Sequence, residues 1–304
     1  MLPWRALHAV ILERNKLVAR KVARVFAATG ATTTLLEEPG LLAAHLADAD
    51  LVCADAFDAD VLAEQLRARP DLRGLLWTAE PLKRSLRYMI ESTAIDHVLA
   101  RKDFESPPRT WEVLMVARRL ANATVHPPMS SFLEWGATLI DLEVRASADR
   151  DPTVARVQEF VLALGVPKRV AEMFGELAHE LLMNAIYDAK GISDRKADVV
   201  LGEGERPTVK LGTDGTRLAL QVRDPFGRLE RRHVVEGLAR GLAGEMDHSH
   251  GGAGLGMMVC HNASSAMVFD VARGRHTEVT ALFELDMNLR EFRTQAKSLH
   301  YWSH

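Results

Sequence analysis

Short apolar runs of strand length alternate with segments of helical periodicity through residues 7–123, and this alternation constrains the fold most strongly. The expected strands are Leu7–Leu12, Thr32–Leu36, Leu51–Ala54, Leu75–Thr78 and Val98–Leu99. The expected helices between and after them are Lys16–Ala28, Leu41–Ala47, Val61–Arg69, Leu82–Ile90 and Arg109–Ala123. Strands and helices that alternate at this spacing form a parallel sheet with helices on both faces. We therefore predict a doubly wound, five-stranded α/β domain over residues 1–123, with sites at the carboxyl ends of its strands.

A short polar stretch separates this region from the rest of the chain. Residues 121–131 read ANATVHPPMSS, and the Pro127-Pro128 pair with small polar neighbours is typical of a linker. A length of 304 residues also fits two domains. We place a linker at 124–131, a second domain at 132–290 and a C-terminal tail at 291–304.

The second half has a different pattern, in which long helical segments accompany paired strand-like runs. Its expected helices are Pro152–Leu164, Lys168–Ala189, His233–Leu242 and Leu255–Ala263. Its expected strands are Thr208–Leu211, Leu218–Arg223, Ala266–Ala272 and Glu278–Asp286. Helices on one face of a largely antiparallel sheet give an α+β sandwich.

One face of the long helix carries polar residues of a kind that bind nucleotides. In ELAHELLMNAIYDA, Glu180, Asn184 and Asp188 are spaced i, i+4 and i+8 and so share a face. An amide oxygen such as that of Asn184 can ligate Mg²⁺, and Glu180 can act as a general base toward water. A solvated polar helix face is the alternative explanation of these residues taken alone.

Two further motifs follow in order. A strand ends at Asp224 and is followed by Pro225 and Gly227, which places a carboxylate at the mouth of the sheet. The run HGGAGLGM then precedes an apolar helix, and glycine-rich loops at helix N-termini present N–H groups to phosphates. Each motif is weak alone, but the three in this order are a stronger signal.

The three motifs resemble those of the GHKL ATPase superfamily, the histidine-kinase-like ATP domains, over residues 131–287. ELAHELLMNAIYDA resembles the N-box, DPFG the first glycine box, and GGAGLGM the second. The resemblance implies ATP and Mg²⁺ as cofactors, Glu180 as the catalytic glutamate and Asn184 as the magnesium ligand. It implies ATP binding by Asn184, Asp188, Asp224, Gly227, Gly252, Gly254, Leu255, Gly256 and Thr277. The first box departs from the family, because Phe226 stands where a glycine is usual.

The order of parts before the N-box is most similar to the anti-sigma-factor serine kinases. His179-Glu180 superficially resembles the phosphoacceptor motif of histidine kinases, but it lies inside the N-box, and no separate helical hairpin precedes it. Residues 230–250 would form the ATP lid. Whether Arg231, Arg232, His233 or Arg240 reaches phosphates there, or only forms a solvated helix face, stays open.

The first half resembles response-regulator receiver domains over residues 5–122. Asp55 ends the third expected strand at the phosphoacceptor position, and Thr78 and Lys102 match the family's Thr/Ser and lysine positions. Receivers carry two adjacent acids after the first strand, whereas this chain has Glu13 followed by Arg14. Arg14 replaces a magnesium ligand with a positive charge, so the charge of phosphoryl transfer is poorly neutralised. We therefore predict a pseudo-receiver that acts as a protein-interaction module.

The bulk properties exclude some classes of function. A net charge of -3 gives no attraction to nucleic acid or to anionic membranes. No apolar run is long enough to span a bilayer. Cys53 and Cys260 lie in apolar runs and are expected to be buried free thiols, which fits a reducing compartment. We expect a cytoplasmic protein.

The leading interpretation is a signalling protein that binds Mg-ATP and phosphorylates or sequesters a protein partner. The alternatives are a non-catalytic, nucleotide-sensing scaffold that docks partners through the pseudo-receiver, and an orphan histidine kinase. The sequence leaves open whether ATP is hydrolysed or transferred, which partner is bound and whether the chain forms a homodimer.

Overall fold

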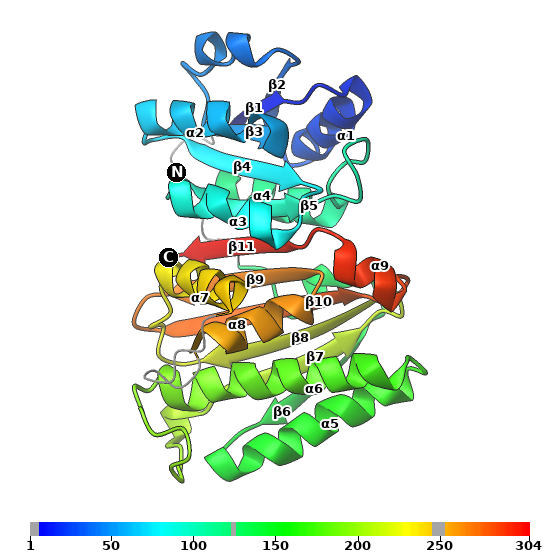
Figure 1. Cartoon of the computed structure of the whole chain (residues 1–304), viewed down its shortest axis with the longest axis vertical. Coiled ribbons are helices and arrows are strands. Elements are labelled where there is room, and N and C mark those ends of the chain that lie inside the picture. Colours follow the sequence, from blue (N-terminus) through cyan, green and yellow to red (C-terminus); the bar gives the residue numbers. More distant parts are fainter. Residues whose placement is uncertain (1–5, 123–125, 245–252) are drawn as a thin grey trace. The chain divides into compact units, whose positions relative to one another are not determined.

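The computed structural model describes residues 6–122, 126–244 and 253–304. The chain divides into two compact units (Figure 1). The first unit comprises Met1–His126 and Thr294–His300, and the second comprises Pro127–Arg293 and Tyr301–His304.

The sheet of the first unit has the strand order β2-β1-β3-β4-β5, and its four strand pairs are parallel. The strands are β1 His8–Leu12, β2 Thr32–Leu36, β3 Leu51–Asp55, β4 Arg73–Thr78 and β5 Ile95–Ala100. This order is one of the doubly wound arrangements, found in flavodoxin and in CheY. All residues of β3 are buried, as expected for a central strand covered on both faces. The predicted receiver-like fold is therefore confirmed for this unit.

Helices cover this sheet in two pairs. α1 (Lys16–Ala27) packs against α4 (Thr110–Ala121), and α2 (Ala59–Ala68) packs against α3 (Leu82–Glu91). The helix expected at Leu41–Ala47 is wrong, because the chain forms 3₁₀ turns at Pro39–Leu41 and Ala43–His45 instead. A segment this short gains too few hydrogen bonds to offset the cost of starting an α-helix.

The residues after 290 form regular structure and not only a tail. α9 spans Leu289–Thr294, and β11 spans Ser298–Ser303. Leu299 and His300 pair antiparallel with β5 of the first unit. Ser298 donates to Glu112 Oε2 at 2.6 Å and accepts from the backbone N–H of Ala100 at 2.8 Å. This pairing joins residues almost 200 positions apart, so the local sequence pattern does not reveal it.

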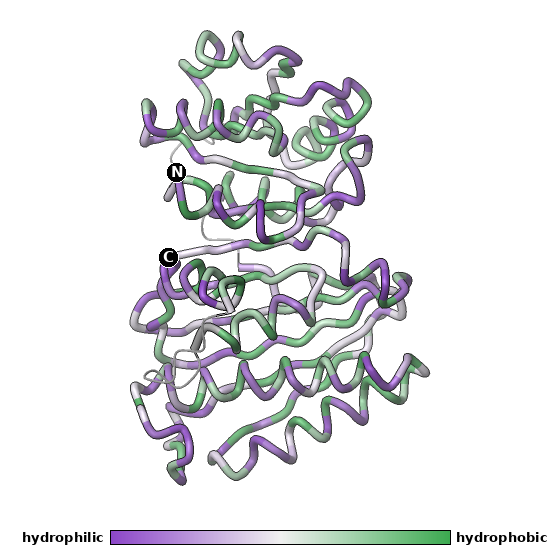
Figure 2. The backbone as a smooth tube through the Cα atoms, in the orientation of Figure 1, coloured by the Kyte–Doolittle hydropathy of each residue, from purple (hydrophilic) through white to green (hydrophobic). Residues whose placement is uncertain are grey.

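The second unit has an antiparallel sheet of order β9-β10-β8-β7-β6. Its strands are β6 Thr138–Glu143, β7 Thr208–Thr213, β8 Arg217–Asp224, β9 Ala266–Ala272 and β10 His276–Glu284. Figure 2 shows hydrophobic stretches along β8, β9 and β10, and every residue of β9 is buried.

Four α-helices of this unit lie on one face of the sheet in Figure 1: α5 Arg150–Ala163, α6 Lys168–Met183, α7 Arg231–Ala243 and α8 Ala253–Asn262. α6 packs against α5 and α8, and α7 packs against α8. α6 also contacts β8, so the helix that carries Glu180 lies over the strand that ends in Asp224. The α-helix predicted to continue to Ala189 ends at Met183 and is followed by a π turn over Asn184–Asp188.

Candidate functional site

Three of the predicted receiver residues lie at the carboxyl edge of the first sheet. Glu13 follows β1, Asp55 ends β3 and Thr78 ends β4, and all three are buried. The edge forms because parallel strands bring their carboxyl ends together. The hydroxyl oxygen of Thr78 accepts a hydrogen bond from the backbone N–H of Glu80 at 2.9 Å.

Arg101 joins the two acids of this edge. Its Nη2 lies 2.5 Å from Asp55 Oδ2, and its Nη1 lies 3.2 Å from Glu13 Oε2. The same Glu13 oxygen accepts a hydrogen bond from Trp77 Nε1 at 2.9 Å. All of these side chains are buried, so the guanidinium is an internal counter-ion for both carboxylates.

Lys102 is the residue that the sequence pattern matches to the lysine of receiver domains, and the ion pair with Asp55 comes from Arg101, the residue before it. Lys102 is exposed. β5 ends at Ala100, so Arg101 is the first residue beyond the strand and enters the edge directly. The exact end of a strand is hard to read from sequence, and a shift of one residue reverses the direction of the side chain.

Arg14 is bound away from Asp55. Its guanidinium forms two hydrogen bonds to the buried carboxylate of Asp58, at 2.6 and 3.1 Å. The cation that contacts Asp55 is therefore Arg101, although Arg14 is the departure from the receiver pattern that the sequence displays.

Asp55 has an altered protonation equilibrium. Burial raises its pKa to about 6, while the backbone N–H of Phe57 and the charge of Arg101 oppose this shift. Asp55 Oδ1 accepts the hydrogen bond from Phe57 N–H at 2.9 Å. Within the described residues, no group of three or more His, Cys, Asp or Glu side chains is arranged to hold a metal ion.

In the second unit, strand register places Thr277 opposite Asp224. Asp224 is the last residue of β8, and Thr277 lies beside it on β10. Both side chains are buried. Asp224 Oδ1 accepts hydrogen bonds from Phe226 N–H at 2.8 Å and Gly227 N–H at 3.3 Å, which orient the carboxylate. Burial raises the pKa of Asp224, and these N–H groups oppose the shift.

The structure also brings together Glu180 and Gly256, which are 76 positions apart. Glu180 lies on α6 and Gly256 lies in the first turns of α8. A Cβ atom built on Gly256 would collide with the Glu180 carboxylate and would lie 3.1 Å from its Cδ. The Glu180 carboxylate therefore lies directly against the Gly256 backbone, and a larger residue at 256 would require it to move.

Asn184 begins the π turn, where the backbone N–H of Ala189 donates to its carbonyl oxygen at 2.8 Å. This turn contacts β8. π turns inside helices occur frequently at functional sites. Asp188, at the end of the turn, forms an ion pair with Arg195. The wider π turn moves Asp188 out of the i+8 position that a continuous α-helix would give it.

The segment predicted to be a second glycine box is described only in part. Gly252 lies outside the described residues, as do His248 and His250. Gly254, Leu255 and Gly256 lie in α8, which begins at Ala253, two residues before the predicted start. In the predicted lid, Arg231, Arg232, His233 and Arg240 lie on α7, and Arg232 pairs with Glu230 at 2.8 Å.

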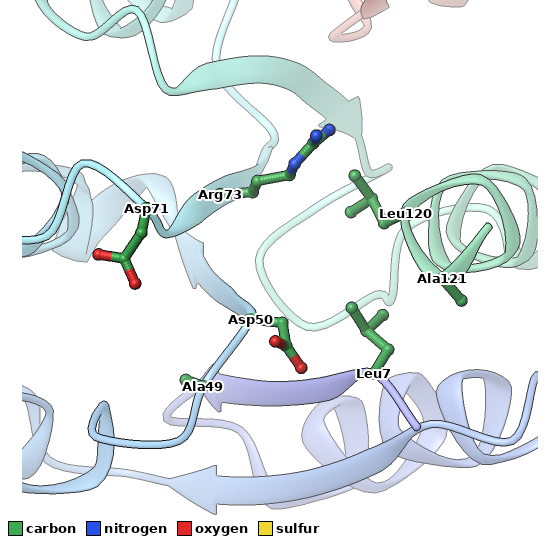
Figure 3. A pocket seen from close by; sticks show the side chains of 7 residues that line it. All are labelled: Leu7, Ala49, Asp50, Asp71, Arg73, Leu120 and Ala121. Atoms are coloured by element: carbon green, nitrogen blue, oxygen red, sulfur yellow. The ribbon is translucent and has the colours of Figure 1, made fainter. Parts of the chain in front are cut away.

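A separate pocket of about 290 Å³ opens at the amino edge of the first sheet (Figure 3). Its polar lining includes Asp50, Asp71 and Arg73. Asp50 accepts a hydrogen bond from the backbone N–H of His8 at 2.8 Å, and Asp71 pairs with Arg69 at 2.6 Å. Both acids thus have structural partners, and none of the predicted site residues lines this pocket.

Every helix of the described residues is too short or too polar to cross a membrane. The sequence matches no family model, and no curated protein was found to match it.

Solved structures similar to this chain are receiver domains, and they align with 38–39% of it. A response regulator from Thermotoga maritima is 12% identical, is covered over 98% of its length and has a TM-score of 0.34. A CheY-like receiver domain protein from Methanospirillum hungatei is 12% identical, with 96% covered and a TM-score of 0.34. The receiver domain of an HD domain-containing protein from Pseudomonas fluorescens is 19% identical, with 94% covered and a TM-score of 0.33. The receiver-like fold of the first unit rests on its own strand order.

Proposed function

We propose that this chain is a signalling protein whose second unit binds Mg-ATP in the manner of the GHKL ATPases. The observation that carries the proposal is the contact between Glu180 and Gly256. It joins the N-box helix to the second glycine box, two motifs that the sequence pattern alone does not bring together.

The chain's own residues suit the parts of such a site. The buried Asp224 carboxylate is oriented by two backbone N–H groups and would accept a hydrogen bond from the adenine amine, with Thr277 beside it. Asn184 would ligate Mg²⁺ through its amide oxygen, the kind of ligand that this ion prefers. Bound ATP would supply a γ-phosphoryl group.

Glu180 would act as the general base. A half-buried carboxylate beside the first turns of α8 can accept a proton from water or from a partner's hydroxyl group. The positive end of the α8 dipole would favour phosphate oxygens at the same place. The site therefore supports either ATP hydrolysis or transfer to a serine of a partner protein, and we propose a regulatory protein of the anti-sigma-factor kinase type.

Calorimetric titration of the full-length chain with Mg-ATP tests the proposal. Asn184→Ala is expected to weaken binding by at least about tenfold, because it removes a metal ligand. Asn262→Ala, at an exposed position of α8, is the control. Equal affinities of the wild type and Asn184→Ala would exclude the site.

A second candidate function is a nucleotide-sensing scaffold without catalysis, and the Arg101–Asp55 pair favours it for the first unit. A phosphoacceptor aspartate must be reachable by a phosphoryl donor, whereas Asp55 is buried against a guanidinium. Steady-state ATP turnover separates the two functions. Turnover that Glu180→Ala abolishes supports the enzyme, and tight binding without turnover supports the scaffold.

A further inference from the structure

Six arginines gather at one end of the second unit, and we call this surface the arginine rim. They come from the end of β8, from the loop that leads to α7, and from the turn between β9 and β10. The members are Arg223, Arg228, Arg231, Arg232, Arg273 and Arg275. All are exposed except Arg231, which is half-buried.

A contact between two glycines brings the loop and the turn together. The backbone N–H of Gly274 donates to the carbonyl oxygen of Gly227 at 3.2 Å. Gly227 has a φ of +63°, and a Cβ atom there would collide with the carbonyl oxygen of Ala272 and lie 2.9 Å from Arg275 N. The close approach places the backbone of Arg228, which follows Gly227, beside the turn that carries Arg273 and Arg275, while the Arg228 guanidinium extends to Gly191.

The other arginines adjoin this contact. The turn begins directly after β9 and leads into β10, whose first residues pair with the end of β8. Arg223 lies on that end of β8, with its Nη2 3.1 Å from His276 Nδ1. The Arg228 guanidinium lies 5.9 Å from the centre of the Phe226 ring.

The rim has little negative charge to balance it. Two described carboxylates lie beside the rim: half-buried Glu230, which Arg232 binds at 2.8 Å, and buried Glu278, which stands opposite Arg223 in the strand register. In the part of the chain that the structure describes, Arg223, Arg228, Arg273 and Arg275 form no ion pair with a carboxylate. Protein surfaces normally intersperse both signs, because charges of one sign repel. This clustering of positive charge is the more unusual because the net charge of the whole chain is -3.

We propose that the arginine rim binds an acidic segment of a partner protein. Guanidinium groups bind carboxylates through paired hydrogen bonds, and several of them in one place suit a run of Asp and Glu side chains. A protein segment fits better than nucleic acid, because a long polyanion would also meet the net negative charge of the rest of the chain. The proposal goes beyond Mg-ATP binding, since the rim contains none of the residues to which we assign ATP or Mg²⁺ contacts above. Arg231 and Arg232 also belong to the predicted ATP lid, so the test reverses Arg273 and Arg275 instead.

Fluorescence anisotropy with a labelled poly-glutamate peptide and the full-length protein, without nucleotide, tests this surface. The double reversal Arg273→Glu/Arg275→Glu is expected to weaken binding by at least about tenfold, because attraction becomes repulsion. Arg20→Glu/Arg24→Glu, which reverses two exposed arginines of α1, is the matched control and should change affinity by less than about twofold. Thermal melting would verify that both variants fold.

Competition and nucleotide titration complete the test. Rising salt should weaken the peptide complex, and duplex DNA should displace the peptide only poorly. Equal losses of peptide affinity in the rim and control variants, or stronger binding of duplex DNA than of the peptide, would overturn the proposal.

Mg-ATP affinity should be unchanged in Arg273→Glu/Arg275→Glu, and a parallel loss of Mg-ATP affinity would assign these arginines to the nucleotide instead. Failure of wild-type Mg-ATP binding alone would overturn only the proposed function, because the peptide assay contains no nucleotide.

Discussion

Nη2 of Arg101 lies 2.5 Å from Oδ2 of Asp55, so the cation of the receiver-like edge comes from the residue directly after β5. The same guanidinium reaches Glu13, which makes one buried cation the shared partner of two buried acids. In a receiver of the usual kind, a magnesium ion neutralises the acids at this edge. Here the chain carries a permanent positive charge of its own at that place.

Removal of this cation should destabilise the first unit. Arg101→Met is expected to lower the free energy of unfolding by about 3–5 kcal/mol, because it leaves two buried carboxylates without a counter-ion. Lys102→Met, which removes an exposed cation next to it, should change that free energy by less than about 0.5 kcal/mol. Urea unfolding measures both values, and similar effects of the two variants would contradict the assignment of Arg101.

Asp55 should make stability depend on pH. Its pKa of about 6 in the folded chain is above the value in the unfolded chain, so the folded state binds the proton more tightly. Proton binding by Asp55 stabilises the folded state, and this contribution to the free energy of unfolding is complete below about pH 4. It amounts to on the order of 3 kcal/mol and is lost as the pH rises through 6. Unfolding measured between pH 4 and 7 should show a steeper loss of stability in the wild type than in Asp55→Asn, which keeps the buried Asp224. Asp60→Asn, at an exposed position, controls for the change in net charge.

The contact between Glu180 and Gly256 predicts coupled substitutions. Gly256→Ala should cost up to about 1 kcal/mol of stability, because the added methyl group forces the flexible Glu180 side chain to move aside. Gly256→Ala in a Glu180→Ala background should cost much less, since the carboxylate is gone. Gly204→Ala, where no atom lies within 4 Å of the new methyl group, is the control. Additive effects in the double-mutant cycle would show that the two residues are not in contact.

Gly227 combines a positive φ with a close approach to backbone atoms. Gly227→Ala is expected to destabilise the protein by at least about 2 kcal/mol, through the strained backbone and the collision with the β9–β10 turn. Gly215 also has a positive φ, of +86°, but has open space around it. Gly215→Ala therefore isolates the backbone strain, and thermal unfolding should rank it as the milder of the two changes.

Ser298 should hold β11 to the first unit. Its hydroxyl group contacts Glu112 and the backbone N–H of Ala100, and all three sites are buried. Ser298→Ala is expected to cost about 1–3 kcal/mol, because two buried polar groups lose a partner. Ser303→Ala, at the exposed end of β11, is the control and should have little effect. If hydrogen exchange of the β5 and β11 amides were unchanged in Ser298→Ala, this role would be disproved.

The sequence by itself determined the local structure of the first unit and the order of the motifs in the second. Alternating apolar runs and helical periods are local signals, since burial on both faces of a parallel sheet requires continuous apolar strands such as Leu51–Asp55. The spacing of Glu13, Asp55 and Thr78 at strand ends follows from the same pattern.

Tertiary structure alone decided which side chains meet. Arg101 reaches Asp55, because the last residue of β5 sets the direction of the side chain that follows. The π turn at Asn184, the contact of Glu180 with Gly256 and the strand made by Ser298–Ser303 all depend on partners distant in sequence. Local propensity carries no information about such partners, since their free energy is gained only when distant segments pack together.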